Sequence, residues 1–265
     1  MKYKLLIISI SIILLLILFI LIIGNKCKNE FNNYNNRTVY VSMTTLPERL
    51  ITKWFYDNLK RNISMLSPGQ ILILHIPYKT LKGNKYIIPD NVKNLEGNNF
   101  IINRVQNDEG PITKILPALR NDMIRDDDII IICDDDLYYK PNVFMLLEKN
   151  VNKYPQNVSI MCNSNAYSKK NQVQGYKGFA FVKKLLKRLI NFDIPEECFK
   201  VDDNVISHYI NINNIKVIDF PYNNNKNSLC SVDSKKTNEN KPKWYELRND
   251  DRIGDVKKCL IKLNI

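Results

Sequence analysis

The sequence contains, at its centre, the segment Ile129-Ile130-Ile131-Ile132-Cys133-Asp134-Asp135-Asp136. Consecutive apolar residues of this kind are typical of a strand that is buried on both faces. Three adjacent carboxylates at the end of such a strand repel one another, and a divalent cation with oxygen ligands relieves the repulsion. In an extended chain Asp134 and Asp136 point to one side and Asp135 to the other. The segment therefore predicts an Asp-x-Asp pair that binds Mg²⁺ or Mn²⁺, with a solvated acidic loop as the alternative.

Other short runs rich in Ile and Val, bounded by turn residues, predict further strands. With the central strand at 128–133, the predicted strands lie at 38–43, 70–76, 99–105 and 157–162. Segments with helical periodicity alternate with them, at 48–66, 112–124 and 141–154. This alternation favours a mostly parallel α/β sheet covered on both faces, which binds ligands beyond the carboxyl ends of its strands. Residues that follow the strands are therefore the candidates for chemistry.

Hydroxyl and basic side chains follow two other predicted strands at the same edge. Thr44, Thr45 and Arg49 follow the first strand, and Lys114 ends the segment 110–114 after the third. Arg49 and Lys114 can reach phosphate oxygens, and the free N–H groups of a helix start attract anions. We expect a phosphate-bearing ligand at this edge.

A second acidic pair, Asp202-Asp203, opens a helical stretch that continues through Ile210. Because the N-terminus of a helix favours negative charge, one interpretation is that Asp202 caps this helix. The functional interpretation is that a carboxylate in a cleft facing the metal site removes a proton from an attacking hydroxyl.

Composition narrows the class of protein. The chain has 265 residues, enough for one large domain or two small ones, and 39 Lys and Arg against 27 Asp and Glu give a net charge of +12. The lysines are scattered, and no basic stripe interleaved with aromatic residues occurs, so we expect no nucleic-acid partner. The chain contains no Cys-x-x-Cys pair, which argues against a structural zinc module.

The N-terminal region predicts a membrane anchor. Residues 5–23 carry no charge and would form about 28 Å of helix, close to the thickness of a bilayer's hydrocarbon core. The apolar run is longer than that of a cleaved signal peptide, so we expect an uncleaved signal anchor. The expected organisation is a cytoplasmic tail at 1–4, a stem at 24–37 and a luminal catalytic domain at 38–265, as in a single-pass type II membrane protein. Residues 221–265 are expected to form a partly mobile extension, because 223–243 are rich in Asn, Lys and Ser.

Modification patterns and cysteines suit a luminal domain. The N-glycosylation pattern occurs at Asn36, Asn62 and Asn157, a number that so Asn-rich a chain also reaches by chance. Cys27 lies beside the predicted membrane span, and Cys133 is expected to be a buried small hydrophobe. The four other cysteines could pair in three ways in an oxidising lumen, and they are Cys162, Cys198, Cys230 and Cys259.

Taken together, these motifs resemble nucleotide-sugar glycosyltransferases of the GT-A fold, in particular members from polysaccharide clusters and large DNA viruses. The shared pattern is a Thr-Thr-x-Pro-x-Arg opening, a Gly-Pro-x-Thr-Lys segment, an Asp-Asp-Asp run and a later Asp-Asp pair, here at 44–49, 110–114, 134–136 and 202–203. The resemblance spans most of residues 38–220 and lies in the order and spacing of the motifs. It implies a GT-A-like, Rossmann-like mixed sheet, a nucleotide-sugar donor, and a glycan or glycoprotein acceptor.

The same resemblance implies roles on the donor side. Asp136, with Asp134, would bind Mn²⁺ (or Mg²⁺), and Asp134 or Asp135 would face the ribose and the metal waters. The ion would neutralise the leaving diphosphate. The nucleotide would be held by Thr44, Thr45 and Arg49, and Lys114 would lie near the diphosphate or the donor sugar.

On the acceptor side, the resemblance implies a loop that contains Gly175, Tyr176 and Gly178, although a plain turn is an equal alternative. Asp203 is the first choice for the general base of an inverting displacement, and Asp202 the second. Many GT-A enzymes supply a further metal ligand, often His, from beyond the last core strand. This chain has no His after position 208, and we expect His75 and His208 to be structural.

Two other classes of protein fit parts of the pattern. A haloacid-dehalogenase-like phosphohydrolase also places Asp-x-Asp after a strand and an Asp pair later, but Tyr138 stands where that pattern has Thr or Val. A non-catalytic, membrane-tethered glycan-binding protein would bind glycan without nucleotide.

Overall fold

The computed structural model describes residues 15–20, 37–161, 172–219, 231–233, 236 and 252–264. The chain divides into two compact units, Met1–Arg37 and Thr38–Ile265. In the first unit residues 15–20 are helical, and the rest of the predicted span at 5–23 and residues 24–36 of the stem lie outside the described residues. Within the described ranges, no helix has both the length and the apolar character needed to cross a membrane.

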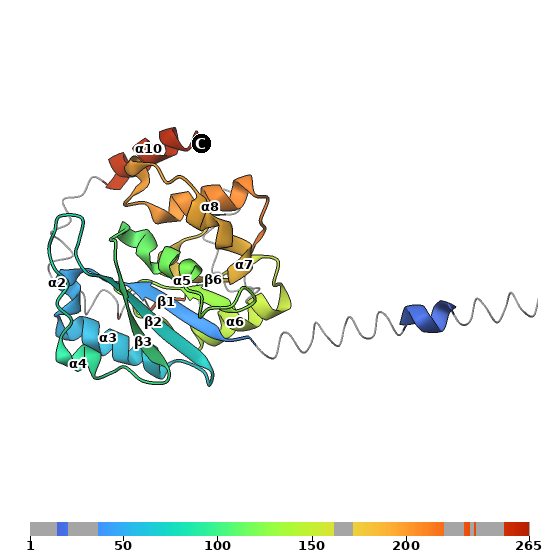
Figure 1. Cartoon of the computed structure of the whole chain (residues 1–265), viewed down its shortest axis with the longest axis horizontal. Helices are drawn as coiled ribbons and strands as arrows, with labels where there is room; N and C mark the ends of the chain where they lie inside the picture. Colours follow the sequence, from blue (N-terminus) through green and yellow to red (C-terminus); the bar gives the residue numbers. More distant parts are fainter. Residues whose placement is uncertain are drawn as a thin grey trace, which may run out of the picture. The chain divides into compact units, whose positions relative to one another are not determined.

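A seven-stranded sheet forms the centre of the second unit (Figure 1). The strands, in spatial order, are β3 (Phe100–Val105), β2 (Gln70–Pro77), β1 (Val39–Thr44), β4 (Ile129–Ile132), β6 (Phe179–Val182), β5 (Val158–Ile160) and β7 (Val217–Asp219). Strand β6 is antiparallel to both of its neighbours, and the other pairings are parallel. The prediction of a mostly parallel, mixed α/β sheet is confirmed, and all five predicted strands are present.

Alternate residues of the strands face two separate cores. Val41, Leu74 and Ile131 belong to a core covered by α2 (Pro47–Leu50), α3 (Lys53–Ser64), α4 (Asp90–Lys93) and α6 (Val143–Lys153). Ile73, Ile130 and Phe181 belong to the other core, covered by α5 (Leu116–Arg120), α7 (Lys183–Leu186), α8 (Asp202–Ile212) and α10 (Arg252–Lys262). In Figure 1, α3 and α4 lie on one side of the sheet and α5 and α8 on the other. Strand β4 is buried on both faces because both layers cover it.

The helix predicted at 48–66 is two helices, so that prediction is wrong in its continuity. Thr52 has an extended backbone with ψ of 147°, and its side chain accepts a hydrogen bond from Phe55 N. The Thr52 hydroxyl also donates to Arg49 O, the carbonyl near the end of α2. Thr52 therefore ends one helix and caps the next, and the break leaves Arg49 at the edge of the sheet.

The helix predicted at 112–124 is also interrupted. Residues Gly110–Lys114 form a 3₁₀ helix, η1, and α5 begins at Leu116 with Pro117 in its first turn. Proline is favoured there and unsuited to the interior of a longer helix, which explains the division. The third predicted helix is α6, which starts after Asn142, a residue with φ of 67°.

The C-terminal half holds elements that the sequence patterns did not reveal, namely β6, β7 and α10. Helix α10 lies in the segment predicted to be partly mobile, and a disulfide between Cys198 and Cys259 ties it to η4 (Glu196–Cys198). This bond belongs to one of the three expected connectivities; Cys162 and Cys230 lie outside the described residues. Cys133 is fully buried and has a free thiol, as expected.

Two of the predicted glycosylation positions are wrong. Asn62 is 0% exposed on the inner face of α3, and Asn157 is 5% exposed beside β5, so neither side chain can carry a glycan in this fold. Asn36 lies outside the described residues.

Candidate active site

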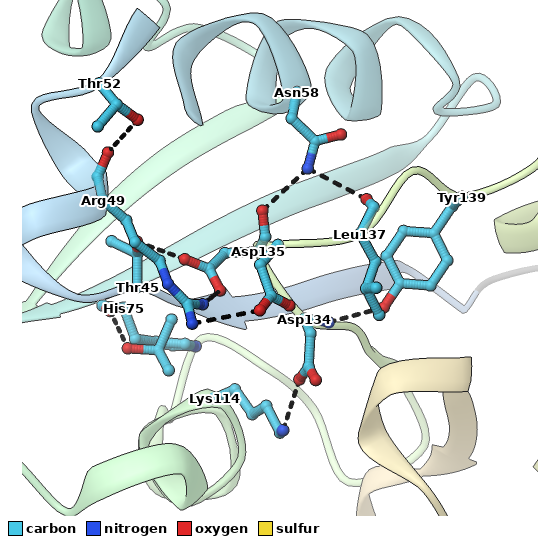
Figure 2. A network of polar contacts seen from close by, with 12 residues as sticks. Thr45, Arg49, Thr52, Asn58, His75, Lys114, Asp134, Asp135, Leu137 and Tyr139 are labelled. Carbon is cyan, nitrogen blue, oxygen red and sulfur yellow. Dashed lines mark hydrogen bonds and ion pairs between the residues drawn. The ribbon is translucent and has the colours of Figure 1, made fainter. Parts of the chain in front are cut away.

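The acidic run leaves the sheet beside the end of β1. The amide of Cys133 donates to Ser42 O across 3.2 Å, which keeps the chain paired with β1 up to the first aspartate. Asp135 then turns toward the residues that follow β1: the Thr45 hydroxyl donates to it across 2.6 Å, and the Arg49 guanidinium pairs with its other oxygen (Figure 2). The second Nη of Arg49 lies 3.2 Å from Asp136 Oδ2. One buried guanidinium therefore serves two of the three aspartates.

The backbone of the run is fixed by two side chains from the α3 and α6 side of the sheet. Asn58 Nδ2, on α3, donates to the carbonyls of Asp135 and Leu137 across 2.9 and 3.1 Å (Figure 2). The fully buried Tyr139 hydroxyl accepts from Asp134 N at 2.8 Å and donates to Tyr176 O at 3.2 Å. These bonds determine the turn in which the three carboxylates diverge.

Lys114 joins the two acidic elements. Its ammonium lies 2.7 Å from Asp134 Oδ1, after β4, and 2.8 Å from Asp202 Oδ2, at the start of α8 (Figure 2 draws the first of these contacts). The Lys114 side chain is only 5% exposed. Burial alone would lower the pKa of Lys114, but the carboxylates of Asp134, Asp202 and Asp203 outweigh burial and raise it well above its usual value. Lys114 is therefore a permanent cation between the two acidic groups.

Two glycines allow η1, α8 and the loop at Gly175 to lie close to one another. Asp203 Oδ1 accepts a 2.7 Å hydrogen bond from Gly175 N, in the 3₁₀ turn η2 (Gly175–Lys177). A Cβ at Gly175 would lie 2.6 Å from Lys114 Nζ and 3.1 Å from Asp203 Oδ1. A Cβ at Gly110, which has φ of 67°, would lie 2.7 Å from the Phe199 ring just before α8. A side chain at either position would therefore collide with these neighbours. The predicted acceptor-side loop, which contains Gly175, forms a 3₁₀ turn, as the alternative prediction of a plain turn had it.

Negative charge exceeds positive charge in this cluster. Its carboxylates belong to Asp134, Asp135, Asp136, Asp202 and Asp203, and its cations are Arg49 and Lys114. Burial, with the repulsion of Asp202, raises the pKa of Asp203 to about 7. Burial also raises the pKa of Asp135 to about 6, although Arg49 acts in the opposite direction. An additional cation in the cluster would lower the pKa values of both Asp203 and Asp135.

The described part of the chain contains no group of three or more His, Cys, Asp or Glu side chains placed to bind a metal ion together. His75 is fully buried, and burial lowers its pKa to about 3. His208 packs against the Phe192 ring. A metal ion at the acidic run would therefore need ligands other than histidine to complete its coordination.

The remaining predicted residues lie around this cluster and not within it. The Thr44 hydroxyl donates to His75 O across 2.8 Å and so binds strand β2. Tyr176 is 39% exposed, and its carbonyl accepts the hydrogen bond from Tyr139. Gly178 has φ of 79°, and a Cβ at this position would lie 3.5 Å from Ile132 O. Sequence analysis did not identify Asn58 or Tyr139 as site residues. Asn58 stands between Phe55 and Leu59 on the buried face of α3, and a polar residue at that spacing is a signal that could have been used.

The Arg49 contacts predict a large and specific loss of stability. Arg49→Met should lower the free energy of unfolding by about 3–5 kcal/mol, because it leaves the buried Asp135 carboxylate without its cation. Adding Asp135→Asn should recover part of that loss. Urea unfolding of both variants measures this, with Lys53→Met as the control, because Lys53 and Asp57 form an exposed pair on α3. Equal effects of the Arg49 and Lys53 substitutions would contradict the buried ion pair.

The raised pKa of Asp203 predicts an unusual dependence of stability on pH. Between the usual value of 3.8 and the folded value of about 7, the folded state binds more protons than the unfolded state, so the contribution of Asp203 to stability falls as pH rises. Asp203→Asn removes this titration. The variant should therefore gain stability relative to the wild type, on the order of 2 kcal/mol, between about pH 5 and about pH 8.

Urea unfolding at the two pH values tests this expectation. Asp126→Asn is the control, because a hydrogen bond from Lys187 lowers the pKa of Asp126, which stays ionised over the whole range. A difference between wild type and Asp203→Asn that does not vary with pH would show that Asp203 titrates normally.

Comparisons with known proteins show a similar fold. No protein-family model matches the chain, and no curated protein matches its sequence. The structure is similar to a 4-diphosphocytidyl-2C-methyl-D-erythritol synthase, with a TM-score of 0.52, 10% identity, and coverage of 77% of this chain and 98% of that one. A cytidylyltransferase from Leptospira borgpetersenii (TM-score 0.48, 14% identity, 72% and 78% covered) and TarS of S. aureus (TM-score 0.45, 13% identity, 68% and 58% covered) are more distant. At this identity the first likeness shows that the chain shares the Rossmann-like mixed α/β fold of that synthase.

Proposed function

We propose that this protein is a membrane-anchored glycosyltransferase, which transfers a sugar from a nucleotide-sugar donor to a hydroxyl of a glycan or glycoprotein. The observation that carries the proposal is the position of Lys114, whose ammonium lies within 2.8 Å of carboxylates from two acidic elements far apart in the sequence. This contact supports a role for Asp203 as a base acting beside the proposed donor site. The comparisons support the proposal at the level of the fold.

The proposed reaction is an inverting displacement. The acceptor hydroxyl transfers its proton to Asp203 as its oxygen attacks the anomeric carbon of the donor. A new C–O bond forms on one face of the sugar while the bond to the diphosphate breaks on the other, and the nucleoside diphosphate leaves with the bonding electron pair. A carboxyl with a pKa of about 7 suits this role, because a base is most effective when its pKa lies near the working pH.

The charge balance favours a divalent cation in the donor site. A diphosphate would enter a cluster in which carboxylates already outnumber cations, and electrostatic repulsion would oppose its binding. Asp134 and Asp136 fit Mn²⁺ or Mg²⁺ by the chemistry of their oxygens, with the diphosphate and water completing the coordination. The ion would neutralise the negative charge that develops on the leaving group. Arg49 and Lys114 would contribute fixed positive charge beside it.

The proposed location is a secretory lumen, with residues 5–23 as the membrane anchor. The Cys198–Cys259 disulfide supports this part of the proposal, because structural disulfides persist in oxidising compartments. In such a location the exposed Tyr176, which follows the Asp203-bonded Gly175 in the sequence, would face a glycan or glycoprotein acceptor.

Product analysis separates this function from its rivals. A sugar transferase releases a nucleoside diphosphate from a nucleotide sugar, whereas a nucleotidyltransferase consumes a nucleoside triphosphate and releases pyrophosphate. A haloacid-dehalogenase-like phosphohydrolase would form a phospho-aspartate on the acidic run. A non-catalytic glycan-binding protein would give none of these products.

Donor binding is tested by thermal melting of the full chain with UDP, GDP or CMP, each with and without Mn²⁺. A ligand at about 100 times its dissociation constant adds about 2.7 kcal/mol, which raises the melting temperature by several degrees in a domain of this size. We expect a Mn²⁺-dependent increase with one nucleotide, and its loss in Asp134→Asn/Asp136→Asn. The matched control is Asp126→Asn/Asp127→Asn, which alters two surface carboxylates paired with Lys187 and Lys184. A folded protein that no nucleotide stabilises would refute the donor site.

The general base is tested by comparing Asp203→Asn with Asp202→Asn. The first substitution should lower kcat by roughly 10²- to 10⁴-fold and leave the nucleotide-induced increase in melting temperature intact, because the base acts on the acceptor. The second should reduce activity less, since Asp202 pairs with Lys114 and is the second choice for the base. Full activity of Asp203→Asn would exclude it as the base and would fit a retaining mechanism.

A further inference from the structure

A cluster of polar side chains interrupts a mostly apolar face of the sheet, and it includes Thr44, which pairs with His75 in the β1–β2 register. Ser42 on β1, His75 on β2 and Asn103 on β3 lie on the face covered by α5, where most of the other side chains are apolar, among them Ile71, Ile73, Ile130, Ile132 and Phe181. His75 is directly opposite Asn103 in the β2–β3 register. Ser42 and His75 are 0% exposed. Polar groups this deeply buried destabilise a fold unless they are hydrogen-bonded.

Ser42, His75 and Asn103 form one chain of hydrogen bonds. Asn103 Nδ2 lies 2.8 Å from His75 Nδ1, and His75 Nε2 lies 2.9 Å from Ser42 Oγ. Ser42 Oγ in turn lies 2.5 Å from the backbone carbonyl oxygen of Lys114 in η1. The chain therefore crosses three neighbouring strands and ends on the residue whose ammonium joins the two acidic elements.

The last acceptor determines the direction of every bond. A carbonyl oxygen can only accept, so the single Ser42 proton points to Lys114 O. The Ser42 oxygen must then accept from His75, which places the imidazole proton on Nε2. His75 Nδ1 is left as an acceptor for the Asn103 amide. Because burial lowers the pKa of His75 to about 3, the imidazole stays neutral at physiological pH and this arrangement persists.

We infer that Ser42, His75 and Asn103 are positioning residues that fix the backbone of Lys114 so that its ammonium spans Asp134 and Asp202. The inference rests on the proposed function for its catalytic meaning. A lysine side chain has many rotatable bonds, and the position of its backbone limits where its ammonium can reach. Ser42 holds the carbonyl of this very residue, while the other end of η1 is confined by the contact of Gly110 with Phe199.

A purely structural role would not require this arrangement. Replacing bonded polar groups by apolar side chains of similar shape is often neutral or stabilising, and apolar side chains already form most of this face. The polar residues stand at the carboxyl-end half of the strands, on the side where η1 crosses the sheet, and their chain of bonds ends at the candidate active site.

Two pairs of variants test the inference in the full chain. Ser42→Ala removes the bond to Lys114 O, and Ser159→Ala is its matched control, because Ser159 is 2% exposed on β5 and accepts a 2.5 Å bond from Asn150. His75→Gln keeps an amide donor near the position of Nε2, whereas His75→Met has similar volume and no donor. If Ser42→Ala does not fold, the His75 pair still decides the question.

The first measurement is the ¹H–¹⁵N NMR signal of the Lys114 ammonium, assigned by its absence in Lys114→Met. A buried, ion-paired ammonium exchanges slowly with water and gives an observable signal. That signal should be lost or shifted in Ser42→Ala and His75→Met and unchanged in Ser159→Ala and His75→Gln. The Lys183 ammonium, which donates to Asn121 O and Ile124 O across 2.7 Å, is an internal reference that should not change in any variant.

The second measurement is transferase activity, in which kcat should fall roughly 10- to 100-fold in Ser42→Ala and His75→Met and stay near the wild-type value in the other two variants. A Lys114 signal in Ser42→Ala that equals the wild-type signal, or an equal change in Ser159→Ala, would overturn the inference. If the signals change as expected while the wild type has no transferase activity, the proposed function fails and the positioning of Lys114 stands.

Discussion

The buried Lys114 ammonium is the interaction on which the arrangement of the site depends. Transfer of an ammonium from water into a protein interior costs several kcal/mol, and only close carboxylates with good geometry offset that cost. Lys114 has two, one after β4 and one at the start of α8, and its side chain is 5% exposed. Displacement of either element would leave a buried charge without compensation. The contact therefore couples the position of α8 to the position of the acidic run.

The sheet topology explains why so many elements can meet at one point. Strands β1 and β4 are parallel neighbours, so Thr45 and Asp135 leave the sheet at the same edge and come within hydrogen-bonding distance. The break between α2 and α3 leaves Arg49 at the same edge, because the chain changes direction at Thr52 instead of continuing as one helix. On the other face, the disulfide holds α10 to η4, the 3₁₀ helix that precedes α8. The break between α2 and α3 and the disulfide beside η4 thus help to position the residues of the site.

The sequence predicted what depends on local pattern and failed where the outcome depends on tertiary contacts. Runs such as 128–133 identify buried strands because their apolar character is visible in the sequence itself. The acidic and basic residues of the site were identified because they directly follow such strands. The split of 48–66 depends on Thr52 capping one helix while bonding the other, which helical periodicity does not reveal. The short β6 lies antiparallel between two strands through pairings that no local pattern specifies. Asn58, Ser42 and His75 were missed as site residues because their partners are distant in sequence.

The excess of carboxylates determines how the charge of the site is balanced when a ligand binds. Without ligand, Arg49 and Lys114 are both paired with aspartates, and burial together with the repulsion of Asp202 raises the pKa of Asp203. Under the proposed function, a diphosphate that arrives with a divalent cation gives Lys114 a second anionic partner and gives Asp134 a second cation. The diphosphate and the divalent cation carry opposite charges that nearly cancel, so the pKa of Asp203 would stay near the value that burial and Asp202 set. The donor and its cation would therefore enter the site without shifting the pKa of the candidate base away from neutral pH, and the balance of charge links the two halves of the site.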